Sequence, residues 1–127
     1  MDDYTGTSLP TKQRPFAVTV LGWLFIAIGA VSLAMDVRFA FTRGGGIDEA
    51  WIFLVHALAI VAGAFMLRGA DWARWLAVLW MAFHVAITVM NAWRGFAFHA
   101  ILFAGITYLL FRADARAWFR TETATGT

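Results

Sequence analysis

The chain has 127 residues, of which 61% are hydrophobic and only 14% are charged, and its mean hydropathy is +0.70. A soluble domain of this size is usually about half apolar and about a quarter charged, and its interior is too small to hide more apolar surface than that. The composition therefore excludes an ordinary soluble domain and predicts a membrane protein.

Charge and cysteine content exclude further classes of protein. The formal net charge is +2, but the basic residues lie at the ends of apolar segments, where membrane proteins carry them. We therefore expect no nucleic-acid partner. The absence of cysteine excludes disulfides, thiolate metal sites and cysteine nucleophiles.

The first apolar segment follows a polar N-terminal tail, residues 1–14, and runs over 15–35 without a charge. At 1.5 Å per residue, about 20 residues cover the ~30 Å hydrocarbon core, so this segment predicts a membrane-spanning helix. A cleaved signal peptide is the alternative, although the segment is longer than the usual apolar core of such a peptide.

Three further spans are predicted after a connection over 36–49, where a Gly-Gly-Gly run permits a flexible turn. These spans cover about 50–67, 72–92 and 94–111. Gly69 suits the end of the second helix and Asp71 the cap of the third. Short second and third connections require antiparallel neighbours. The predicted fold class is thus an all-α membrane protein, an up-down bundle of four transmembrane helices over 15–112, with a C-terminal tail at 113–127.

Lysine and arginine predict the orientation. With the N-terminus in the cytoplasm, seven basic residues flank the inner face, namely Lys12, Arg14, Arg68, Arg74, Arg112, Arg116 and Arg120. Three flank the outer face, namely Arg38, Arg43 and Arg94. Because basic residues concentrate on the cytoplasmic side, both termini are expected inside.

Polar side chains within the spans mark the candidate site, because such groups need partners in hydrocarbon. On the third span three of them are spaced as one helical stripe, and the fourth span contributes one. On the second helix Glu49, His56 and Gly63 are spaced by seven residues and form another stripe. The predicted outer-half polar pocket consists of Glu49, His56, His84, Thr88, Asn91 and His99.

Several kinds of chemistry remain open for this pocket. His56, His84 and His99 could hold a metal ion or relay protons, and His56 and His84 could hold haem. Alternatively, each histidine bonds a neighbouring carbonyl or hydroxyl group and fixes helix register. No cofactor fingerprint, HExxH motif or nucleophile–base pair occurs. We therefore predict no cofactor and no catalytic residue.

Three segments of the sequence carry a family resemblance: 14–22 (RPFAVTVLG), 72–76 (WARWL) and 108–119 (YLLFRADARAWF). They resemble small bacterial inner-membrane proteins with four transmembrane helices, a family defined by a domain of unknown function. The resemblance covers about 14–120. It implies a location in the bacterial inner membrane and implies no activity.

The functional prediction is a non-enzymatic protein that acts through helix packing in the lipid bilayer, as a homo-oligomer or as a small subunit of a larger membrane complex. Small residues four apart, such as Ala59 and Gly63, favour close helix contacts. The alternatives are a transporter or a proton- or metal-handling protein that uses the histidines, and a haem-binding membrane protein.

Overall fold

The computed structural model describes residues 13–91 and 93–120, and every element in this part of the chain is a helix. The helices are α1 (Phe16–Arg43), α2 (Ile47–Arg68), α3 (Asp71–Asn91), α4 (Trp93–Phe111) and α5 (Ala113–Arg120). Most of the predicted N-terminal tail (1–12) and the end of the C-terminal tail (121–127) lie outside the described residues.

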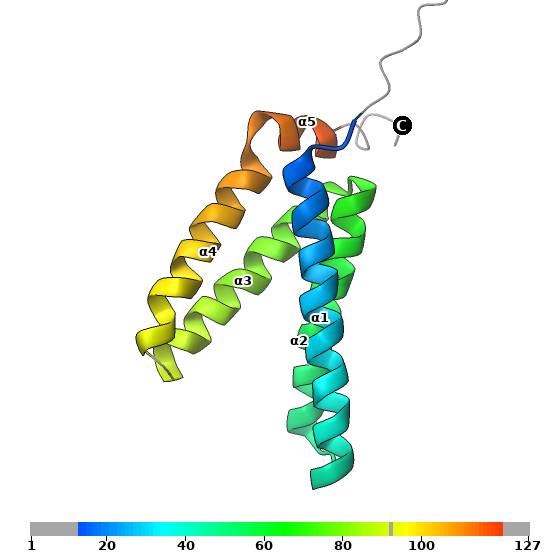
Figure 1. The fold of residues 1–127 in the computed structure, drawn as a ribbon, viewed down its shortest axis with the longest axis vertical. Helices are drawn as coiled ribbons and strands as arrows, with labels where there is room; N and C mark the ends of the chain where they lie inside the picture. Colours follow the sequence, from blue (N-terminus) through cyan, green and yellow to red (C-terminus); the bar gives the residue numbers. More distant parts are fainter. Residues whose placement is uncertain (1–12, 92, 121–127) are drawn as a thin grey trace, which may run out of the picture.

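Four of these helices, α1 to α4, are long and apolar enough to cross a membrane. They run alternately up and down, as Figure 1 shows. The predicted all-α, up-down four-helix fold class is therefore confirmed, and the chain is a multi-pass membrane protein. Gly69 ends α2 in the left-handed conformation, with φ 86°, as predicted for this position.

The prediction that the first helix ends near residue 35 is wrong, because α1 continues to Arg43. It stops only at Gly44, which has φ 77° and donates its backbone N–H to the carbonyl of Ala40 at 3.0 Å. The connection is reduced to the three glycines 44–46. Polar residues after Met35 mark where the helix leaves the hydrocarbon, and neither proline nor glycine interrupts it there.

The first two helices pack tightly as an antiparallel pair. A Cβ atom on Gly29 would lie 2.8 Å from the carbonyl oxygen of His56, and one on Gly22 would lie 3.1 Å from that of Gly63. The first distance is shorter than real Cβ contacts, and the second is tighter than most of them. Glycine therefore permits the close backbone approach of α1 and α2, as expected for helices that pack in lipid.

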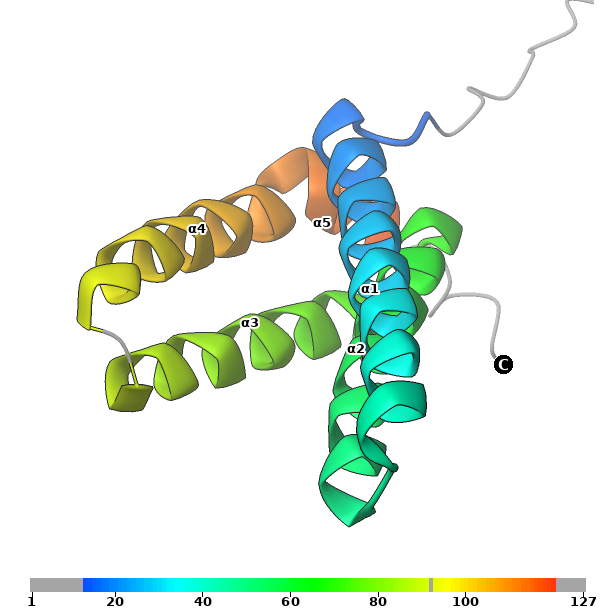
Figure 2. The same ribbon diagram turned by 60° about the horizontal axis from the view of Figure 1, so that its bottom comes forward.

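The second pair, α3 and α4, diverges from the first. Both ribbon views show the two pairs together at one end and apart at the other (Figures 1 and 2). We call the joined end, formed by the start of α1, the end of α2, the start of α3, the end of α4 and α5, the closed end. The opposite end, with the α1–α2 and α3–α4 connections, is the open end.

Helix α5 packs across the closed end and contacts the longer helices there. Its Ala115 and Phe119 are buried, and Trp118 donates its indole N–H to the carbonyl of Met66 at 3.1 Å. The Arg74 guanidinium lies 4.8 Å from the ring centre of Phe111 and 5.6 Å from that of Phe119. These contacts join α5 to α2, and α3 to both α4 and α5.

Candidate functional site

The site begins with a bond between α1 and α2. Nδ1 of His56 lies 2.6 Å from Oδ2 of Asp36, and both side chains are partly buried. Asp36 was expected in the connection rather than in the pocket. Because α1 continues as a helix, Asp36 lies seven residues, or about two turns, beyond Gly29. It therefore lies on the same face as the glycine that contacts the backbone of His56.

This spacing was a signal in the sequence. Gly22, Gly29, Asp36 and Arg43 are seven residues apart on α1, just as Glu49, His56 and Gly63 are on α2. Only the second series was recognised, since the first extends past the end predicted for its helix. Two antiparallel series of equal period place Asp36 opposite His56.

The second histidine, His84, is positioned by Trp80. Nδ1 of His84 lies 2.9 Å from the Trp80 carbonyl oxygen, and the two rings are 3.8 Å apart between centroids. Trp80 in turn donates its indole N–H to the carbonyl of Val55 at 2.7 Å, which ties α3 to α2 beside His56. The predicted pair His56 and His84 therefore lines one hollow of about 370 Å³ between α2 and α3.

The other predicted pocket residues do not line this hollow. Thr88 and Asn91 donate to the carbonyls of His84 and Ile87, at 2.8 and 2.9 Å. Nδ1 of His99 lies 2.9 Å from the carbonyl oxygen of Gly95. Each of these side chains hydrogen-bonds the backbone carbonyl group four residues earlier in its own helix.

Glu49 has a capping role. Its Oε2 accepts the backbone N–H of Gly46 at 2.6 Å, at the start of α2. Among the described residues, no three histidine or acidic side chains lie together in a way that could hold a metal ion. Haem binding between His56 and His84 stays a prediction.

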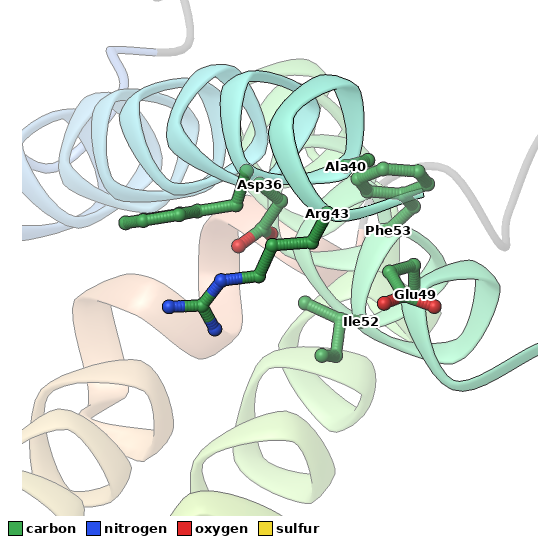
Figure 3. A pocket seen from close by; sticks show the side chains of 7 residues that line it. Asp36, Ala40, Arg43, Glu49, Ile52 and Phe53 are labelled. Atoms are coloured by element: carbon green, nitrogen blue, oxygen red, sulfur yellow. The ribbon is translucent and has the colours of Figure 1, made fainter. Parts of the chain in front are cut away.

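A second hollow, of about 220 Å³, is lined by Asp36, and Ile52 lines both hollows. Figure 3 shows Asp36 and Arg43 projecting toward it from α1, with Ile52 and Glu49 contributed by α2. Asp36 lines this hollow and His56 lines the other one. The Asp36–His56 bond thus connects two hollows near the open end.

The hydrogen bonds determine which nitrogen of each histidine ring can accept a further hydrogen bond or a proton. The Trp80 carbonyl can only accept, so Nδ1 of His84 carries the hydrogen, and in the neutral ring Nε2 carries a lone pair. A carboxylate at Asp36 likewise accepts the hydrogen of Nδ1 of His56, and in the neutral ring this leaves the lone pair on Nε2. The site therefore presents two imidazole nitrogens that can accept a hydrogen bond or a proton.

Comparisons of the chain with models of known protein families, with curated proteins and with solved structures find no match. The fold and the site geometry by themselves define a class, a multi-pass α-helical membrane protein with an Asp–His pair between its first two spans.

Proposed function

We propose that this chain is a small, non-enzymatic subunit of the bacterial inner membrane, with both termini in the cytoplasm, that associates through α4 with a second copy or with a larger complex. The location follows the family resemblance and the orientation follows the distribution of basic residues. The observation that carries the association is the environment of Gly105.

Gly105 differs from the other glycines within the described helices. A Cβ atom added to Gly22, Gly29, Gly63 or Gly95 would meet atoms of another residue within 4 Å, whereas one on Gly105 would meet none. Glycine in a helix interior costs up to about 1 kcal/mol relative to alanine. At the other positions close packing offsets this cost, and at Gly105 no contact within the described chain does so.

The surroundings of Gly105 fit a helix–helix contact. Ala97, Ile101, Ala104 and Tyr108 are exposed and share a face with it, which we call the α4 face. Within the most apolar 18-residue stretch of each helix, 11% of the residues are buried in α4 and 28% in α1, so α4 is less covered by the rest of the chain. Exposed apolar residues alone imply only lipid contact, but small residues permit the close backbone approach that drives helix association in a bilayer.

A single-cysteine crosslinking experiment tests this proposal, since the chain has no cysteine of its own. Ala104→Cys is labelled with a benzophenone maleimide and illuminated in native membranes. We expect a protein adduct, either a dimer or a heteromeric product. The control is Ala27→Cys, at an exposed alanine of α1, where we expect no protein adduct.

Adding Gly105→Leu to the Ala104→Cys variant should abolish the adduct, because the larger side chain keeps a partner helix away. If neither cysteine variant forms a crosslinked protein adduct, α4 faces lipid and the proposed association is wrong.

A second function, proton handling, is favoured by the Asp36–His56 bond, which joins two hollows. A histidine that bonds a carboxylate on one side and lines a hollow with His84 on the other can accept a proton at one ring nitrogen and release the proton of the other. Arg43 and Glu49 are charged groups that line the same hollow as Asp36.

In vesicles that contain the purified chain and an internal pH dye, we expect proton flux above that of empty vesicles. His56→Asn should reduce the flux to the level of empty vesicles, whereas His99→Asn, outside the hollow, should not. Equal flux in empty and protein-containing vesicles would exclude this function.

A further inference from the structure

The hollow between α2 and α3 continues into a second, adjoining hollow. The first is about 370 Å³ and contains His56 and His84. The second is about 330 Å³, and the described residues that line it are all apolar or carry an indole. Trp51, Val55 and Phe83 line both. We call the two together the α2–α3 groove, which has an imidazole end and an apolar end.

The groove opens toward lipid. Trp51, Phe83 and Leu79, which border it, are 65%, 46% and 68% exposed. These side chains belong to helices that cross the membrane, so the surface they expose faces hydrocarbon. An occupant therefore enters from the bilayer and is itself soluble in lipid.

The imidazole end requires more than a hydrocarbon occupant. Nδ1 of each ring is engaged, by Asp36 for His56 and by the Trp80 carbonyl for His84. Nε2 of each ring has no hydrogen-bond partner among the described residues. A lipid acyl chain would leave both nitrogens unpaired, which is costly in a nonpolar medium. The favoured occupant brings a hydrogen-bond donor.

The side chains that line the groove indicate the shape of the apolar part of the bound molecule. Trp51 and Phe83 present aromatic side chains along both hollows, and Trp80 is held rigidly by its bonds to Val55 and against His84. Aromatic rings pack favourably against flat rings in offset or edge-to-face arrangements. A mostly apolar groove with a few polar groups at one end is typical of small-molecule sites.

We propose that the α2–α3 groove binds a lipid-soluble aromatic alcohol of the phenol or hydroquinone class. Its ring packs against Trp51 and Phe83, and its hydroxyl group donates to Nε2 of His56 or His84. Asp36 acts as a positioning residue, since its bond to Nδ1 holds the His56 ring with Nε2 as the acceptor. This binding goes beyond both functions proposed above and does not depend on association through α4.

The test uses 4-fluoro-1-naphthol as the probe and the full chain in lipid nanodiscs, with binding followed by fluorine NMR. The matched compound is 1-fluoro-4-methoxynaphthalene, which has the same ring system but no hydroxyl hydrogen. We expect saturable binding of the naphthol beyond its partition into empty nanodiscs, and partition alone for the methoxy compound. Equal behaviour of the two compounds would overturn the proposal, because it would show an apolar groove that any lipid fills.

Two variants locate the hydroxyl group. His56→Asn and His84→Asn each keep a donor near the position of Nδ1 and remove Nε2, so the bonds to Asp36 and to the Trp80 carbonyl have a substitute. Loss of one hydrogen bond should weaken naphthol binding about two- to tenfold in at least one of the two variants. His99→Asn removes an equivalent nitrogen outside the groove and should bind as the wild type does.

Helix content and elution in detergent identify variants that keep the fold, and the comparison is made on those. Wild-type affinity in folded His56→Asn and His84→Asn would overturn the assignment of the groove. If one of the two fails to fold and the other binds as the wild type does, the comparison of the naphthol with its methoxy analogue on the wild-type chain decides the proposal.

Discussion

Gly22, Gly29, Asp36 and Arg43 form a series along α1 that combines two kinds of contact. Its first two members permit backbone contact with α2, and Asp36 binds His56 across the same interface. Residues seven apart in a helix drift by only about 20° per heptad, so the series stays on one face. The same residue spacing therefore serves both the close packing of α1 against α2 and the polar pair near the open end.

Gly63→Leu should destabilise the chain, because Gly63 lies against the backbone and the Ile26 side chain of α1. Overpacking of a close interface usually costs about 1–3 kcal/mol. The measurement is unfolding by sodium dodecyl sulfate in mixed micelles, at a dilution where the chain is monomeric.

Gly105→Leu is the matched control, since a Cβ atom there meets nothing within the described chain. It should unfold at or above the wild-type midpoint, because leucine favours the helix over glycine. Equal loss of stability in both variants would contradict the role assigned to the α1–α2 interface.

At the scale of the element, α5 shows how eight residues hold two helix pairs together. Phe119 is fully buried, and Trp118 reaches the last turn of α2. Arg74 pairs with Asp71 at 2.6 Å, while its Nε and Nη1 are buried without a hydrogen-bond partner in the described part of the chain. The faces of Phe111 and Phe119 compensate in part, because a guanidinium above an aromatic ring is attracted by the electrons of the ring.

Phe119→Ala should loosen the closed end and let the two helix pairs move relative to each other. Loss of a buried phenylalanine typically costs about 3–5 kcal/mol. Double electron–electron resonance between spin labels at Ala27→Cys and Ala104→Cys, on α1 and α4, reports this motion. We expect a broader distance distribution in the variant.

Trp118→Phe keeps an aromatic ring and removes the indole N–H that bonds the Met66 carbonyl, a loss of about 1 kcal/mol. It also removes part of the indole that lies against Gly69 and Arg14. Its distance distribution should remain close to that of the wild type. An unchanged distribution in Phe119→Ala would show that direct contacts among α1 to α4 suffice to hold the closed end.

At the scale of the whole molecule, the number of spans and their alternating direction were predictable, since the thickness of the bilayer dictates how long an apolar helix must be. The end of α1 was not, because polarity marks where a chain leaves hydrocarbon and says little about where its helix stops. With 28 residues, α1 is about 42 Å long at 1.5 Å per residue, well beyond the ~30 Å core.

The site was predictable only in part. His56 and His84 were predicted to share one outer-half pocket, and they line the same hollow. The bond between Asp36 and His56 was not predicted, because the first helix was expected to end before Asp36. The remaining polar residues bond their own helices, as His99 does with Gly95. The divergence of the two helix pairs could not be predicted. Residue periodicity shows which residues share a face of a helix, but it does not show which other helix packs against that face.

The α1–α2 interface has a consequence for biogenesis. Every residue that forms it lies before residue 69, and a turn of three glycines joins its two halves. As soon as the second segment leaves the translocation machinery, this hairpin has all the partners it needs for its glycine contacts and its Asp36–His56 bond. The charged member of that bond therefore gains its counterpart during synthesis, before the remaining half of the protein is inserted.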